Sequence, residues 1–193
     1  MKFTIDKDDA LVVVDIQKDF LPGGALPVPE GDEIIPKMNT YIEKFEQAGA
    51  KIYATRDWHP PNHKSFKSQG GIWPPHCVQN SEGAGFHPDL ELPEETDIIS
   101  VGYKPSLEGY SAFEGTNLGQ KLEEDGINRL FVGGLATDYC VKHTVIDALK
   151  IGMETIVLTD ASRGVNKEPN DAQKAIEEMR KTGTEEATLA DIR

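Results

Sequence analysis

The chain of 193 residues has only two cysteines, Cys77 and Cys140, and they form no CxxC motif. This scarcity excludes a disulfide framework and a thiolate zinc finger, and it indicates reduced thiols. No apolar run approaches the roughly 20 residues that a membrane-spanning helix needs. The polar segment 1–9 also lacks the apolar centre of a signal peptide. We therefore expect a cytoplasmic protein that has no membrane partner.

Positive charge is scarce as well. The chain has 20 Lys and Arg against 33 Asp and Glu, a net charge of -13. Such a surface repels nucleic acid and anionic lipid, so the expected partner is a small molecule. No internal repeat and no linker divides the sequence, and we expect a single domain over residues 1–193. The oligomeric state stays open, a homo-oligomer included.

What the sequence does contain is a regular alternation of strand and helix patterns. The continuous apolar run 9–16 is typical of a parallel strand buried on both faces. This alternation predicts an α/β fold of three layers, α/β/α, with about six mostly parallel strands and helices on both faces. No GxGxxG follows the first strand, which argues against a dinucleotide-binding enzyme. The further expected strands are 51–55, 97–101, 129–133, 154–159 and 186–189, and the expected helices are 34–48, 117–124, 139–149 and 171–181.

Two residues at strand ends could carry chemistry, because ligands of such sheets bind beyond the carboxyl ends of the strands. Asp15 ends the first strand, where desolvation would raise its carboxyl pKa and suit it to act as a general base. A loop or helix-cap aspartate fits the position equally well. Cys140 follows the Gly133-Gly134 turn at the start of a helix, where free N–H groups would lower a thiol pKa and could hold an oxyanion. A buried cysteine acting as a small hydrophobe is the alternative.

The Pro-, His- and Trp-rich stretch 56–90 contains a candidate metal site. Asp57 and His59 are two residues apart, so in an extended segment their side chains point the same way. With His76 they would form a set of one carboxylate and two imidazoles, which suits Zn, Fe or Mn. His63 is a candidate fourth ligand. The alternative is a group of surface histidines in a polar loop.

Lys104 follows the third expected strand. A lysine near a thiol stabilises the thiolate, but Lys104 taken alone reads as a surface residue. His87 and Cys77 have no comparable setting, and we interpret both as structural.

Residues 11–145 contain VVVDIQKDFLPGGALPV, TRDWHPPNHKSF, WPPHCVQ with GAGFHP, a lysine before YSAF, and GGLATDYCV. In this order the segments resemble the nicotinamidase/pyrazinamidase branch of the isochorismatase-like cysteine hydrolases. The resemblance implies a catalytic triad of Asp15, Lys104 and Cys140. It also implies one divalent metal ion, zinc first and Fe or Mn as alternatives, and its ligands would be Asp57, His59 and His76, with His63 possible.

The same resemblance implies a cis peptide between Leu135 and Ala136, so that the N–H groups of Ala136 and Cys140 form an oxyanion hole. The implied substrate pocket is formed by Phe20, Trp73, Tyr110 and Leu135.

The implied activity is hydrolysis of nicotinamide, and of pyrazinamide, to the acid and ammonia through a thioester, with a role in NAD salvage. Hydrolysis of another small amide, a carbamoyl compound or a ureido compound is the alternative on the same fold. Cleavage of a vinyl ether needs no thiol nucleophile, so Cys140 argues against it. A metal- or ligand-binding module without activity is a further alternative, although a pure binder needs no activated thiol.

Overall fold

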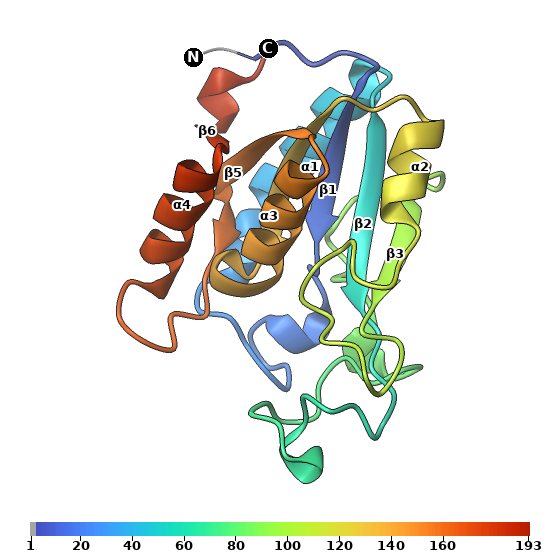
Figure 1. Cartoon of the computed structure of the whole chain (residues 1–193), viewed down its shortest axis with the longest axis vertical. Helices are drawn as coiled ribbons and strands as arrows, with labels where there is room; N and C mark the ends of the chain where they lie inside the picture. Colours follow the sequence, from blue (N-terminus) through green and yellow to red (C-terminus); the bar gives the residue numbers. More distant parts are fainter. Residues whose placement is uncertain (1–2) are drawn as a thin grey trace.

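The computed structural model describes residues 3–193. Its centre is one six-stranded, all-parallel sheet with the strand order β3-β2-β1-β4-β5-β6 (Figure 1). The predicted α/β class and mostly parallel sheet are confirmed. The strands are β1 (Asp9–Val14), β2 (Lys51–Asp57), β3 (Asp97–Val101), β4 (Arg129–Leu135), β5 (Glu154–Arg163) and β6 (Glu185–Ala187).

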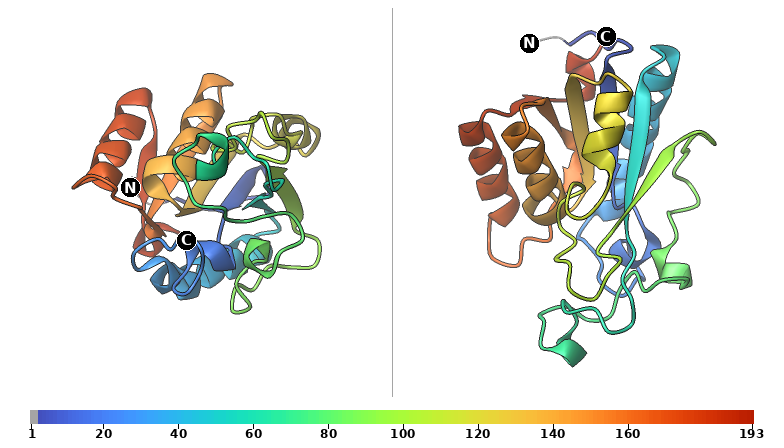
Figure 2. Two further views of the ribbon diagram at one scale, coloured as in Figure 1. Left: turned by 90° about the horizontal axis from the view of Figure 1, so that it is seen from below. Right: turned by 45° about the vertical axis from the view of Figure 1, so that its right-hand side comes forward.

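Helices cover both faces of the sheet, as expected from the fully buried pattern of β1 (Figure 2). Helix α1 (Ile35–Gln47) packs on one face through Met38, Ile42 and Phe45, against the alternate residues Leu11 and Val13 of β1. The other face carries the alternating residues Ala10, Val12 and Val14. There they meet α2 (Leu118–Glu124), α3 (Lys142–Lys150) and α4 (Asp171–Thr182).

The carboxyl ends of the strands point toward one loop-rich end of the molecule (Figure 1). The strand register brings distant residues together at this edge, because Val14 pairs with Gly134 and Asp57 pairs with Val101. Gly134 has φ +128°, and a side chain there would meet the Val14 carbonyl oxygen at 2.1 Å. Glycine is therefore required where β4 passes closest to β1.

Several element boundaries differ from those predicted: β2 and β5 are longer and β6 is shorter, and two differences near the site have a clear cause. β1 ends at Val14 rather than at residue 16, because Asp15 adopts φ +49° and turns the chain out of the sheet. The helix expected over 139–149 is a wide π-type turn, Thr137–Val141, followed by α3. In the described part of the chain, no helix is long and apolar enough to cross a membrane.

Candidate active site

Asp15 lies at the centre of the loop-rich edge and is 1% exposed. Its Oδ1 accepts a 2.6 Å hydrogen bond from the Thr55 hydroxyl, while Oδ2 has no hydrogen-bond partner among the described residues. Burial, together with the charge of Asp57, raises the pKa of Asp15 to about 8. A carboxyl group that titrates near neutral pH is suited to accept and return a proton.

Cys140 faces Asp15 from the turn before α3. The Ala136 carbonyl accepts hydrogen bonds from the N–H groups of Tyr139 and Val141, which closes the turn around Cys140. The peptide between Leu135 and Ala136 is cis, as the resemblance implies. The Cys140 sulfur lies within 4.8 Å of carboxylate oxygens of Asp15 and Asp57.

The thiol does not have the electrostatic setting expected from the sequence. Burial, followed by the charges of Asp15 and Asp57, raises the pKa of Cys140 well above its ordinary value. The sequence predicted a lowered pKa, from the start of a helix. That prediction is wrong because two buried carboxylates outweigh the turn's N–H groups. The thiolate must therefore form together with a proton transfer.

Lys104 does not reach the pair formed by Asp15 and Cys140, and this part of the predicted triad is corrected. Its side chain is exposed, and its ammonium lies 5.2 Å from the centroid of the Tyr103 ring. β3 ends at Val101, and Gly102 with φ +57° turns the chain before Lys104 is reached. Val101, not a lysine, is buried in the same apolar cluster as Cys140. Within residues 3–193, no lysine or arginine lines the pocket that contains the thiol.

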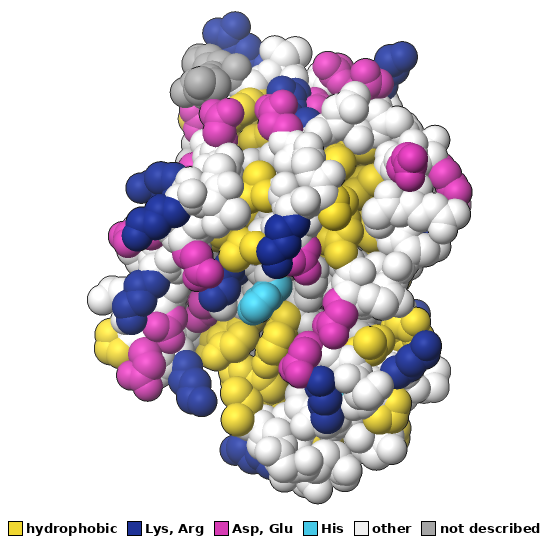
Figure 3. Space-filling model, viewed as in Figure 1, with side chains coloured by type: hydrophobic (Ala, Val, Ile, Leu, Met, Phe, Trp, Pro, Cys, Tyr) yellow, Lys and Arg dark blue, Asp and Glu magenta, His cyan; other side chains and the backbone are white. Residues whose placement is uncertain are grey.

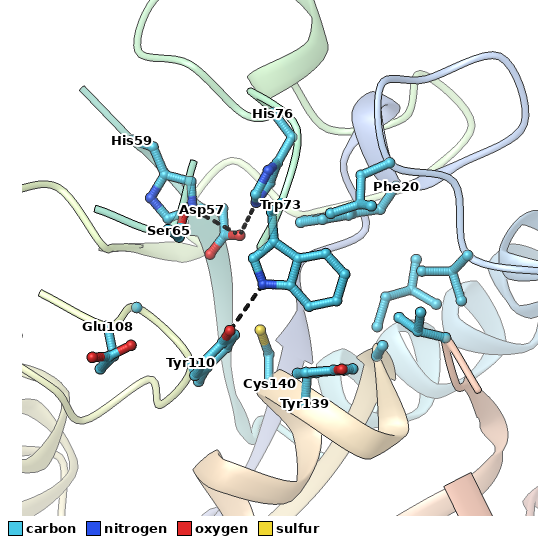
Figure 4. A pocket seen from close by; sticks show the side chains of 16 residues that line it. Phe20, Asp57, His59, Ser65, Trp73, His76, Glu108, Tyr110, Tyr139 and Cys140 are labelled. Atoms are coloured by element: carbon cyan, nitrogen blue, oxygen red, sulfur yellow. Dashed lines mark hydrogen bonds and ion pairs between the residues drawn. The ribbon is translucent and has the colours of Figure 1, made fainter. Parts of the chain in front are cut away.

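The predicted metal ligands converge beside this pair. Asp57 ends β2, and its Oδ2 lies 3.1 Å from His59 Nε2 and 3.6 Å from His76 Nε2 (Figure 4). Charge interactions and hydrogen bonds with the two histidines outweigh the effect of burial and hold the pKa of Asp57 well below its usual range. One ligand atom from each of the three residues falls within a 4.8 Å cluster, and all three residues are buried.

Each of the two histidines His59 and His76 also contacts a backbone carbonyl through its Nδ1, and this contact fixes the orientation of the ring. The Nδ1 of His59 lies 3.0 Å from the Gly102 carbonyl oxygen, and the Nδ1 of His76 lies 2.7 Å from that of Pro74. If each Nδ1 donates its proton to its carbonyl, the Nε2 lone pairs of both rings face the Asp57 carboxylate. A bound metal ion would take the place of protons on these Nε2 atoms, so the residues fit a divalent metal.

His63 lies outside this ligand cluster in the described residues. Its ring stacks on His59 with the centroids 4.0 Å apart, and its Nδ1 lies 2.8 Å from the Ser65 hydroxyl. Burial, followed by the charge of His59, lowers the pKa of His63 to about 4. A neutral ring of this kind can still bind a metal, and His63 Nε2 is buried without a hydrogen-bond partner among the described residues, so His63 stays a candidate further ligand.

An apolar pocket of about 480 Å³, open mouth included, leads to Cys140. The four predicted pocket residues, Phe20, Trp73, Tyr110 and Leu135, all line it. Trp73 Nε1 donates a 2.9 Å hydrogen bond to the Tyr110 hydroxyl, which ties two walls together (Figure 4). Figure 3 shows apolar side chains gathered in the loop-rich half of one face, flanked by acidic ones.

Sequence reasoning missed several lining residues. The loop after β1 contributes Leu26 and Val28, and the segment after β5 contributes Val165. The neighbours of motif residues, Tyr139 and Ser65, could have been found by their positions beside Cys140 and in the histidine loop. Glu108, at the pocket's edge, had no signal because its loop has no periodic pattern.

The fold and site together define an α/β protein of the doubly covered parallel-sheet class, with a thiol and a carboxylate paired beside a metal-ligand set. The isochorismatase domain model matches residues 9–191. The chain belongs to the isochorismatase family.

Several of its relatives are named nicotinamidase or pyrazinamidase. The nicotinamidase of Escherichia coli is 44% identical over 94% of this chain and 95% of its own. A pyrazinamidase of Pyrococcus horikoshii in complex with zinc is 53% identical, with a TM-score of 0.90 over 94% of this chain and 99% of that chain. A yeast nicotinamidase bound to the inhibitor nicotinaldehyde has a TM-score of 0.87 at 28% identity, over 93% and 99% of the two chains.

Proposed function

We propose that this protein is a nicotinamidase, which hydrolyses nicotinamide to nicotinate and ammonia and also accepts pyrazinamide. One observation carries the proposal: the Cys140 sulfur lies within 4.8 Å of the Asp15 carboxylate and lines a pocket walled by aromatic side chains. An aromatic ring bearing a carboxamide matches these apolar walls. The nicotinamidase and pyrazinamidase relatives support the same substrates.

The chemistry begins with a proton transfer. Asp15 accepts the proton of the Cys140 thiol as the sulfur attacks the carboxamide carbon and forms the carbon–sulfur bond. The carbonyl oxygen becomes an oxyanion, which the N–H groups of Ala136 and Cys140 bind. Because burial holds the resting thiol protonated, proton transfer and attack are coupled.

The second half of the reaction returns the enzyme to its starting state. The oxyanion collapses, the carbon–nitrogen bond breaks, and Asp15 gives its proton to the leaving ammonia. Asp15 then takes a proton from water, which attacks the thioester carbon. The carbon–sulfur bond breaks, nicotinate leaves, and the proton returns to the Cys140 sulfur.

Asp57, His59 and His76 would hold a divalent ion, with zinc as first choice and Fe or Mn compatible with the same donors. When bound, the ion supplies a fixed positive charge and a Lewis acid close to the substrate ring. Phe20 lies 5.5 Å from the His76 ring, centroid to centroid, so an apolar wall adjoins the ligand set.

Ammonia release from nicotinamide tests the function. We expect turnover by the wild-type protein and none by Cys140→Ala, which should still bind nicotinamide measurably because the pocket walls are intact. Chelation should lower turnover, and zinc should restore it. Release of ammonia from carbamoyl or ureido compounds, with none from nicotinamide, would overturn the proposed substrate and leave the nucleophile in place.

A further inference from the structure

The two carboxylate oxygens of Asp57 have different surroundings. Oδ2 lies next to the Nε2 atoms of His59 and His76. Oδ1 is buried and has no hydrogen-bond partner among residues 3–193. The histidine cluster therefore contacts one oxygen of the Asp57 carboxylate, and the other oxygen is available to a different group.

Asp15 repeats this pattern. Thr55 satisfies its Oδ1, whereas its Oδ2 is buried without a partner in the described part of the chain. Ligand atoms of Asp15, Asp57 and Cys140 all lie within 4.8 Å of one another, and the three residues are at most 7% exposed. Leaving a buried carboxylate oxygen without a partner is costly.

In the described residues, neither carboxylate is paired with a lysine or arginine, and the side chains paired with Asp57 are the rings of His59 and His76. Lys104 is exposed over Tyr103, and neither lysine nor arginine lines the pocket in the described residues. Asp15, Asp57 and Cys140 thus bring two carboxylates and a sulfur into one small buried space, and one oxygen of each carboxylate has no hydrogen-bond partner among the described residues.

We propose that Asp15, Asp57 and Cys140 form a second metal site, which takes a thiophilic divalent ion such as Zn²⁺ or Cd²⁺. Sulfur and carboxylate donors together select borderline and soft ions over Mg²⁺ or Ca²⁺. Asp57 bridges the two sites, with Oδ2 on the ion of the histidine cluster and Oδ1 on the second ion. Carboxylates shared in this way are common where two metal ions lie about 3.5–4 Å apart.

Binding forms a metal–sulfur bond and displaces the thiol proton to solvent. The bound sulfur is a much weaker nucleophile, because the ion withdraws electron density from it and blocks the approach of a carboxamide. The second ion therefore inhibits turnover when metal exceeds one equivalent per chain. The site itself does not depend on which amide is the substrate.

Cadmium reports on the site directly, because a cadmium–thiolate bond has an ultraviolet charge-transfer absorption. We would titrate metal-free protein with Cd²⁺ and follow this absorption together with bound cadmium by equilibrium dialysis. The expected result is two ions per chain, with the absorption rising as the site with sulfur fills. Binding of a single ion without the absorption would overturn the proposal.

Three variants test which residues give rise to the cadmium–thiolate absorption. Cys140→Ser should lose the absorption and bind the second ion at least 100-fold more weakly, yet keep the first ion. Asp15→Asn should weaken the second ion at least 10-fold with the first unchanged. Cys77→Ser is the matched control, since the buried Cys77 offers no ligand atom to either cluster, and it should behave like the wild type. An absorption that persists in Cys140→Ser and vanishes in Cys77→Ser would refute the site.

A measurement on the unmodified protein guards against variants that do not fold. Iodoacetamide labelling of Cys140, read by peptide mass spectrometry, should fall at least 10-fold once the second equivalent of Cd²⁺ is added. Labelling that is unchanged at two equivalents would contradict the proposal, whatever the turnover with nicotinamide.

Discussion

The Gln17 side chain holds the backbone of Asp57 from both sides. Its Oε1 accepts a 2.7 Å hydrogen bond from the Asp57 N–H, and its Nε2 donates one of 2.8 Å to the Asp57 carbonyl. Nε2 also donates to the Ala84 carbonyl, and Gln17 is fully buried. The loop after β1 thereby fixes the position of a candidate metal ligand at the end of β2.

Gln17→Leu should lower metal affinity about 10- to 100-fold, because groups that orient a ligand contribute on that scale. Zinc affinity by competition with a chromogenic chelator measures the loss. Asn39→Leu is the matched control: Asn39 makes a similar pair of bonds, to the Asp89 carbonyl and the Glu91 N–H, far from the site. Equal zinc affinity in wild type and Gln17→Leu would show that Asp57 needs no such support.

Lys104→Ala should leave kcat/KM for nicotinamide within about twofold of wild type, since the ammonium lies over Tyr103 and outside the pocket. Steady-state ammonia release is the measurement. Lys64→Ala serves as a comparison, because Lys64 is ion-paired with the pocket-edge residue Glu108. A loss of 100-fold or more in Lys104→Ala would mean that the loop moves to bring this lysine to Cys140.

Val101→Lys should place a cation where the structure has none, since Val101 shares the buried cluster of Cys140. A nearby ammonium stabilises the thiolate, so we expect faster alkylation of Cys140 at neutral pH and loss of the second cadmium ion. Val101→Met introduces an unbranched side chain close to lysine in length but without its charge. It should change neither the alkylation rate of Cys140 nor the binding of the second cadmium ion. Identical alkylation rates in the lysine and methionine variants would argue that residue 101 does not face the thiol.

Tyr110→Phe should raise KM for nicotinamide about 5-fold while kcat changes little. The substitution leaves the Trp73 N–H without its acceptor, a cost of about 1 kcal/mol at the pocket wall. Initial-rate kinetics separate the two constants. If kcat fell and KM stayed constant, Tyr110 would contribute to the chemical step rather than to the pocket wall that binds the substrate.

Stability should depend on pH through Asp125, far from the site. The hydrogen bond from Tyr53, 2.5 Å long, is the main cause that lowers the pKa of Asp125. A depressed carboxyl pKa contributes stability above the unfolded value near 3.9, and that contribution is lost as pH falls through the folded value. Asp125→Asn should therefore be less stable than wild type by roughly 1 kcal/mol at pH 7, and the difference should shrink below about pH 4.

Urea unfolding at several pH values measures this effect. Tyr53→Phe removes the same hydrogen bond, so the double variant should lose less than the sum of the two single variants. If the difference in unfolding free energy between wild type and Asp125→Asn stayed constant down to pH 3, the loss would have a cause other than the ionisation of Asp125.

Much of this molecule is determined locally. The buried run of β1 and the helical spacing of α1 predicted strand and helix because hydrophobic periodicity depends only on neighbours along the chain. The sequence also predicted that Asp57, His59 and His76 come together as a candidate metal site, since each belongs to a short segment with characteristic neighbours.

Only the tertiary structure decided the electrostatics of the site. The sequence could not show that Gly102 turns the chain before Lys104, or that Asp15 and Asp57 both face Cys140 from different strands. The thiol pKa and the position of the nearest cation depend on distances between segments that lie far apart in sequence. Such distances are set by how the strands pair and the loops pack, and no local pattern encodes them.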